Sequence, residues 1–158
     1  MNTLEIDTLF QKHPHSRPVF NGVYARNRLP RLLSVPSALV GNTDPDHRMG
    51  QHWVAIYSDA NSKGEYYDPT GRPPLLRAYV NFMNKHCTSW TYNTVRVQEE
   101  GSTVCGHHCI FLPRSSMCRT YHDRRHQTLR KSRWSDDHWT KFCAITCWTC
   151  WMKIFFQI

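Results

Sequence analysis

Three short segments in the middle of the chain most constrain the fold that it can adopt. They are GQHWVAIY (Gly50–Tyr57), GEYYDPTG (Gly64–Gly71) and VQEEGSTVCGHHC (Val97–Cys109). The first is rich in β-branched and aromatic residues and predicts a strand with His52 at its start. In the second, EYYD predicts a short strand and DPTG predicts a turn, so Asp68 is expected at a strand end. Two adjacent strands of this kind bring His52 and Asp68 together.

The third segment follows a stretch, Asn93–Gln98, that alternates like another strand. The sequence EGST predicts a loop in which Ser102 or Thr103 caps a helix, with Cys105 in the first turn of that helix. The partial positive charge at a helix N-terminus favours a thiolate at this position. The pattern therefore predicts a reactive cysteine where a loop enters a helix.

A histidine, an acid, a glutamine and a cysteine are together the residue types of a thiol hydrolase. His52 is expected to take the proton of Cys105 and to leave a thiolate–imidazolium pair. Asp68 is expected to hold the other imidazole nitrogen. The Gln98 side-chain amide and the Cys105 backbone N–H are the expected donors to the anionic tetrahedral intermediate.

The motifs HW, YYD and Q…CG, in this order and with Gln98 seven residues before Cys105, resemble those of the adenovirus protease (adenain) family. They look closest to the adenain-like proteases of large virus-like DNA transposons and, more distantly, like the ubiquitin-like-protein proteases. The resemblance covers residues 20–112. It implies an α+β fold of the papain-like or adenain-like kind, in which a central mixed sheet packs on a helix that starts at the nucleophile. It also implies catalytic roles for His52, Asp68, Gln98 and Cys105, with Asp68 where adenain itself has Glu.

The activity that the resemblance implies is that of a cysteine endopeptidase acting on a protein or peptide substrate. An isopeptidase for ubiquitin-like proteins is the alternative among enzymes. A catalytically inactive remnant or a nucleic-acid-binding fragment is the alternative outside enzymes. Gly50, Trp53 and Gly106 are assigned to substrate binding, and Trp53 is expected to serve both the core and the wall of the site. No metal or organic cofactor is expected, the chain is expected to be a monomer, and the resemblance permits an activating peptide or DNA.

Other histidines and cysteines lie close to the predicted nucleophile in the sequence. The run CGHHC (Cys105–Cys109) contains metal-ligating residue types but lacks the CxxC or HxxxH spacing of a zinc site. His107 and His108 follow the nucleophile on one short helix, where their side chains are expected to face away from its thiol. His52 is therefore the predicted base, and Cys109 is the alternative nucleophile.

Composition indicates a globular domain rather than a secreted or membrane protein. The 158 residues are 40% hydrophobic and 20% charged, which is ordinary for one soluble domain with its own core. The first residues, MNTLEIDTLFQKHPHS, carry acids where a signal peptide has a basic region. The seven cysteines are interpreted as thiols. We therefore expect a location in the cytoplasm or nucleus and no membrane partner.

The sequence that flanks the three segments predicts two helices and two strands. Met1–His13 predicts a short amphipathic helix capped by Asn2 or Thr3, and Pro73–His86 predicts a second helix. For VFNGVYARNRLP, before the histidine, the resemblance implies an edge strand or a loop at the rim of the site. SALVGNT predicts a buried strand beside HWVAIY.

Residues 113–158 differ in character from the rest of the chain. Residues 1–112 carry 11 Lys/Arg and 9 Asp/Glu, a net +2, whereas residues 113–158 carry 9 and 3, a net +6. No glycine follows residue 106, and Pro113 is expected to end the Cys105 helix early. We interpret residues 1–112 as a C-terminally incomplete protease domain and residues 113–158 as a poorly ordered tail produced by loss of the reading frame. A basic nucleic-acid-binding segment, or a membrane contact through Phe142–Ile158, is the alternative.

Overall fold

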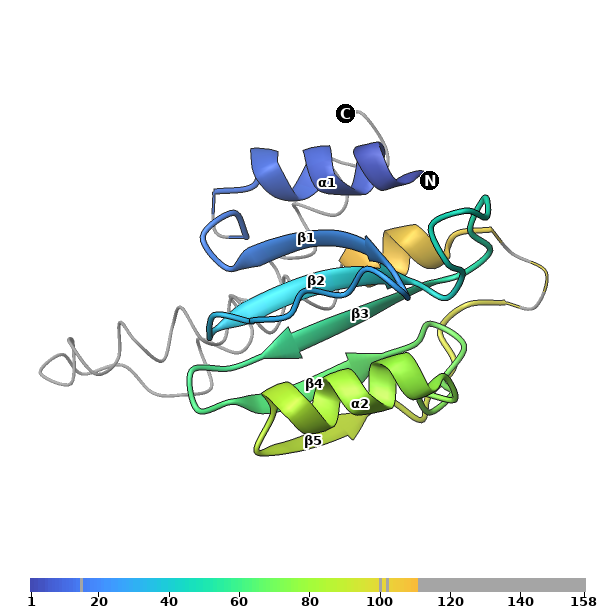
Figure 1. Ribbon diagram of the computed structural model, residues 1–158. Helices are drawn as coiled ribbons and strands as arrows, with labels where there is room; N and C mark the ends of the chain where they lie inside the picture. The colour runs from blue at the N-terminus through green and yellow to red at the C-terminus, as the bar shows by residue number, and fades with distance from the viewer. Residues whose placement is uncertain (15, 100, 102, 111–158) are drawn as a thin grey trace, which may run out of the picture. The chain divides into compact units, whose positions relative to one another are not determined.

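The computed structural model describes residues 1–14, 16–99, 101 and 103–110 (Figure 1). Its elements are, in chain order, α1 (Thr3–Lys12), β1 (Phe20–Ala25), β2 (Ser37–Asn42), β3 (Trp53–Ser58), β4 (Lys63–Tyr67), α2 (Arg77–His86) and β5 (Ser89–Tyr92). Residues 105–110 are also helical.

The strands form one five-stranded sheet in the order β1-β2-β3-β4-β5. The two outer pairs, β1–β2 and β4–β5, are parallel, whereas β2–β3 and β3–β4 are antiparallel. The predicted mixed sheet is therefore confirmed. Because β3 and β4 run in opposite directions, with Ala55 opposite Tyr67, the start of β3 and the end of β4 lie at the same edge of the sheet. His52 and Asp68 are the residues that flank these two strands at that edge.

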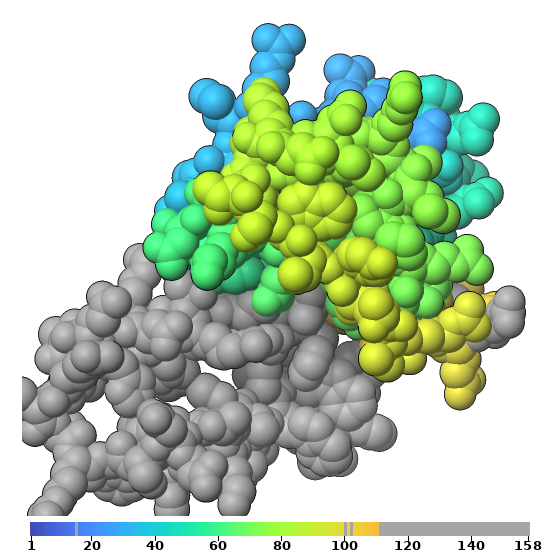
Figure 2. Space-filling model, turned by 90° about the horizontal axis from the view of Figure 1, so that it is seen from below, coloured from blue at the N-terminus to red at the C-terminus, as the bar shows by residue number. Residues whose placement is uncertain are grey.

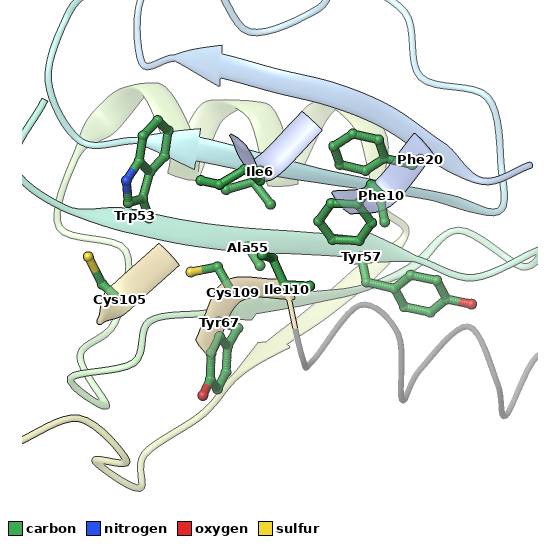
Figure 3. Close-up of a cluster of buried hydrophobic side chains, with 12 residues drawn as sticks. Ile6, Phe10, Phe20, Trp53, Ala55, Tyr57, Tyr67, Cys105, Cys109 and Ile110 are labelled. Carbon is green, nitrogen blue, oxygen red and sulfur yellow. The ribbon is translucent and has the colours of Figure 1, made fainter. Parts of the chain in front are cut away.

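One face of the sheet is covered by α1 and by the helical residues 105–110, as Figure 3 shows. The rings of Phe10 and Phe20 stack with their centroids 4.0 Å apart, which holds α1 against β1. Burial of each large apolar side chain in such a cluster contributes about 1.5–3 kcal/mol to folding. The cluster consists of Ile6, Phe10, Phe20, Ala38, Val40, Trp53, Ala55, Tyr57, Tyr67, Cys105, Cys109 and Ile110.

The opposite face of the sheet packs on α2, which connects the parallel strands β4 and β5. The Tyr79 ring of α2 is fully buried, and its hydroxyl donates a hydrogen bond of 2.6 Å to the Asn42 carbonyl. Figure 2 looks onto the side of the molecule where the yellow-green atoms of α2 and β5 gather, and the segment that follows β5 projects beyond them. The buried residues of this second cluster are Leu39, Val54, Ile56, Tyr66, Tyr79, Phe82 and Met83.

Gly41 leaves the space on β2 that the Tyr79 ring occupies. A Cβ atom at residue 41 would lie 2.4 Å from Oη and 2.8 Å from Cε1 of Tyr79. We expect Gly41→Ala to lower the free energy of unfolding by about 1–3 kcal/mol, because it overpacks the core. Urea unfolding measures this change. In a Tyr79→Leu background the penalty should shrink, since the clashing ring is gone, and an equal penalty in both backgrounds contradicts the explanation.

The N-terminal elements follow the sequence closely. The Asn2 side chain accepts a hydrogen bond of 2.9 Å from the Glu5 N–H, and the Glu5 carboxylate accepts one of 2.8 Å from the Asn2 N–H. This reciprocal capping box satisfies two donors that the first turn of α1 leaves open. The predicted helix and its Asn2 cap are confirmed, as are the edge strand β1 and the buried strand β2.

One predicted strand is wrong. Asn93–Gln98 is not a strand, and the fifth strand comes earlier, at Ser89–Tyr92. The alternating side chains of Val95 and Val97 are 69% and 48% exposed. An alternating pattern stabilises a strand only when one face is buried, and neither valine is buried against the described part of the chain.

The second predicted helix begins later than its sequence indicates. It starts at Arg77 rather than Pro73, and Leu75 is 76% exposed instead of joining the apolar stripe. Pro74 disfavours the helical conformation at the residue before it, which keeps the start of this segment extended. The predictions for residues 113–158, including the membrane contact by Phe142–Ile158, fall outside the described residues. Across residues 1–14, 16–99, 101 and 103–110, no helix combines the length and apolar character needed to cross a bilayer.

Candidate active site

His52 and Asp68 meet at the edge of the sheet. Nε2 of His52 and Oδ1 of Asp68 are 2.8 Å apart, a hydrogen-bond distance. The contact follows from the antiparallel pairing of β3 and β4, because one residue immediately precedes β3 and the other immediately follows β4. The two side chains are only 23% and 9% exposed, so solvent screens their interaction less than it screens a surface pair.

Thr70 holds the Asp68 carboxylate in place. Both its N–H, at 2.8 Å, and its hydroxyl, at 2.7 Å, donate to Oδ1, the oxygen that also contacts His52. Burial by itself raises the pKa of Asp68, but the hydrogen bonds from His52 and Thr70 and the His52 charge outweigh burial and lower the pKa below its ordinary value. The carboxylate is therefore ionised at neutral pH and oriented toward the imidazole.

Asn93 holds the main chain of the same residue. Its Oδ1 accepts from the Asp68 N–H at 2.9 Å, and its Nδ2 donates to the Asp68 carbonyl at 2.8 Å and to the Val95 carbonyl at 3.1 Å. The ladder between β4 and β5 ends at the Tyr66–Tyr92 pair. The Asn93 side chain thus takes the place of the next strand residue and fixes the position of Asp68 relative to β5.

Cys105 is the first residue of the helical stretch 105–110 and is 6% exposed. Burial by itself raises the pKa of its thiol. Hydrogen bonds from His52 and from the backbone N–H groups of Trp53 and Gly106, together with the His52 charge, outweigh burial and lower the pKa below 9.0. Because Nε2 of His52 faces Asp68, Nδ1 is the nitrogen left for the thiol.

The pKa of His52 moves in the opposite direction. Burial lowers it, but the hydrogen bonds to Asp68 and Cys105 and the negative charges of these two residues prevail and raise the pKa to about 9. A group with a raised pKa stays protonated until the pH passes that value. The lowered thiol pKa and the raised imidazole pKa both shift the equilibrium toward a thiolate–imidazolium pair.

Gln98 lies beside the turn that carries the acid. Its backbone N–H donates to the Pro69 carbonyl at 3.1 Å, and the Val97 N–H donates to the same oxygen at 3.0 Å. The Gln98 residue is 7% exposed. These contacts bring residue 98 next to Asp68 although it does not belong to a strand, and a role for its amide in the oxyanion site stays a prediction.

The three residues assigned to substrate binding, Gly50, Trp53 and Gly106, each pack closely against a neighbouring residue. Trp53 is 8% exposed and its Nε1 donates to the Met1 carbonyl at 3.2 Å. Gly106 is buried, and a Cβ there would lie 3.1 Å from Met1 and 3.3 Å from Trp53. Gly50 has φ +79° and packs on Asn42, where a Cβ would lie 2.4 Å from the side-chain nitrogen. Gly50 and Gly106 therefore let the chain pass close to its neighbours, and their contact with substrate stays a prediction.

The structure separates Cys105 from the other thiol on its helix. Cys109 is fully buried in the core, and burial raises the pKa of its thiol well above 9.0. In Figure 3 the Cys105 sulfur lies toward the end of the sheet that Trp53 occupies, whereas Cys109 lies among the other labelled core residues. His107 and His108 are half-buried and burial lowers the pKa of each, whereas His52 is the histidine that lowers the pKa of the Cys105 thiol. Among the described residues, no group of three or more His, Cys, Asp or Glu is arranged to hold a metal ion.

Sequence reasoning missed two residues of the site, Thr70 and Asn93. Thr70 has a recognisable signal, since the side chain of an aspartate at the start of a DPTG turn commonly bonds the backbone two residues later. Asn93 has no such signal, because its role depends on where β5 ends beside β4.

Two solved structures are distantly similar to this chain. No protein-family model and no curated protein matches the chain. The crystal structure of the selenomethionine ASFV pS273R protease is similar at 26% identity and a TM-score of 0.40, over 51% of this chain and 34% of that chain. The central domain of an uncharacterized Legionella pneumophila protein is similar at 15% identity and a TM-score of 0.46, over 75% of this chain and 77% of that chain. Because both TM-scores are below 0.5, the function of the chain is inferred from the geometry of its own site.

Proposed function

We propose that this chain is a cysteine endopeptidase that cleaves peptide bonds with Cys105, His52 and Asp68. The observation that carries the proposal is the 2.8 Å contact between Nε2 of His52 and Oδ1 of the buried Asp68 carboxylate, with the Cys105 thiol close enough to His52 for each to shift the pKa of the other. The directions of the three pKa shifts support it. They favour a charged nucleophile–base pair at neutral pH, which a structural cysteine in a core does not need.

The reaction follows from these positions. The Cys105 thiolate attacks the scissile carbonyl carbon, and the carbonyl π electrons move to oxygen to form a tetrahedral anion. The anion collapses, the C–N bond breaks, and the His52 imidazolium gives its proton to the leaving amine. Water then attacks the thioester while His52 takes one of its protons. Collapse of the second anion releases the carboxylic acid and restores the thiolate and the imidazolium.

Asp68 and Gln98 have different parts in this sequence of steps. Asp68 keeps Nδ1 of His52 directed at the thiol and stabilises the imidazolium. The Gln98 side-chain amide and the Cys105 backbone N–H are the proposed donors to the tetrahedral anion. The buried position of Gln98 and its anchoring on the Pro69 carbonyl support a fixed donor in this place.

Gln98→Ala tests the oxyanion assignment. We expect kcat to fall by about 10²–10³-fold with KM nearly unchanged, because a preorganised donor acts on charge that develops in the transition state. Initial rates of peptide hydrolysis over a range of substrate concentrations measure both constants. Gln51→Ala, at an exposed residue next to His52, is the matched control and should keep the wild-type rate. Unchanged turnover in Gln98→Ala removes this residue from the oxyanion site.

The proposed activity is tested on the full chain with a library of proteome-derived peptides and mass spectrometry of the products. New peptide termini should appear with wild type and be absent with His52→Ala. In parallel, iodoacetamide at substoichiometric amounts should modify Cys105 before the other cysteines, because its lowered pKa favours the thiolate. Cleavage that persists in His52→Ala contradicts the proposal.

A further inference from the structure

The position of the catalytic acid depends on a residue outside the expected triad. We propose that Asn93 is a positioning residue for Asp68: its side chain holds the main chain of residue 68 so that the carboxylate meets His52. The inference deepens the proposed function and rests on it for the hydrolysis readout, whereas the titration of the Cys105 thiol tests it without any substrate.

Asp68 lies just beyond the end of its strand. β4 ends at Tyr67, and the last pair between β4 and β5 joins Tyr66 to Tyr92. The ladder between these two described strands therefore does not reach the main chain of residue 68. Two hydrogen bonds from one Asn93 side chain, of 2.9 Å to its N–H and 2.8 Å to its carbonyl, hold it instead.

The same Asn93 side chain ties the acid to the segment that carries Gln98. Nδ2 of Asn93 also donates to the Val95 carbonyl at 3.1 Å, and the Pro69 carbonyl accepts from the N–H groups of Val97 and Gln98. The Asp68 turn and the segment after β5 therefore fix each other's positions. A shift of about 1 Å in a catalytic group can cost on the order of 10²-fold in rate.

Asn93 and Thr70 act on different parts of Asp68. Thr70 bonds the carboxylate itself and so acts on its charge, whereas the Asn93 contacts to residue 68 are to main-chain atoms. Loss of the Asn93 side chain therefore leaves the hydrogen bonds to the Asp68 carboxylate intact but allows the main chain of residue 68 to shift. The imidazole then has a longer contact with its acid, and the thiolate–imidazolium pair is less stable.

Asn93→Ala is the test, with Asn84→Ala as the matched control. Asn84 makes a comparable contact of 2.9 Å to the Trp90 indole, away from the catalytic residues. We expect Asn93→Ala to lower kcat by on the order of 10–100-fold with KM within about twofold. We expect the pH midpoint of Cys105 alkylation to rise toward the ordinary thiol value of 9.0. Asn84→Ala should change neither quantity.

An Asp68→Ala background separates positioning from general stability. With no carboxylate to place, a further Asn93→Ala change should lower kcat by no more than about twofold, because the two residues act as one unit. An equal loss in both backgrounds overturns the proposal, as does an unchanged alkylation midpoint in a folded Asn93→Ala protein. If thermal melting shows that Asn93→Ala does not fold, Asn93→Ser serves with the same expected directions. A wild type that shows the lowered thiol midpoint but cleaves no peptide overturns the proposed function alone.

Discussion

Cys105→Ala should abolish peptide hydrolysis, with a fall in kcat on the order of 10⁴–10⁶-fold. The expected size follows from the loss of the covalent step, which leaves only binding and the oxyanion donors to act on the substrate. The fold should survive, because the change removes one sulfur at the edge of the core where the Cys105 side chain is 6% exposed. Cleavage of a fluorogenic peptide and the melting temperature together measure the two outcomes.

Cys109→Ala is the matched control on the same helix. The Cys109 thiol is fully buried and burial raises its pKa, so we expect hydrolysis per folded molecule to remain within about twofold of wild type. The cost should appear in stability instead, because the change leaves a small cavity in the core. If Cys109→Ala is the inactivating change and Cys105→Ala is active, the assignment of the nucleophile is wrong.

The parts of the site that sequence predicts are those that depend on local pattern. HWVAIY and EYYD have the composition of neighbouring strands, and antiparallel pairing of such strands brings His52 to Asp68. The helical start at Cys105 also agrees with the sequence, whereas its capping by Ser102 or Thr103 stays a prediction. The mixed sheet and the edge position of β1 also agree with the sequence.

The parts that sequence does not predict depend on contacts between distant segments. Val95 and Val97 alternate as they would in a strand, yet both side chains are exposed and neither packs on the described sheet. The chain uses Asn93 and the Pro69 carbonyl to hold this segment beside Asp68. A side chain that replaces a strand partner has no periodic signal, so propensity alone assigns such a segment wrongly.

Substitution of Asp68 should change the pH dependence of hydrolysis as well as its rate. The active thiolate–imidazolium pair exists above the lowered pKa of Cys105 and below the pKa of His52, which is about 9. Wild-type activity should therefore fall as the pH rises through about 9. Burial lowers the pKa of His52, and the negative charge of Asp68 counteracts this effect. Because Asp68→Asn removes that charge, the pKa of His52 should fall toward or below 6.5. The alkaline limb of the kcat/KM profile should move to lower pH by the same amount.

Asp68→Ala completes the comparison because it removes orientation together with charge. In Asp68→Asn, Thr70 still donates two hydrogen bonds to the oxygen at this position, so the amide oxygen should face His52 and keep part of its alignment. In Asp68→Ala the side-chain acceptor is gone, and kcat should fall by on the order of 10³–10⁴-fold. Activities measured across the pH range for both variants test the order. Equal losses, with the alkaline limb of Asp68→Asn still at about 9, would show that the Asp68 charge is not what keeps His52 protonated.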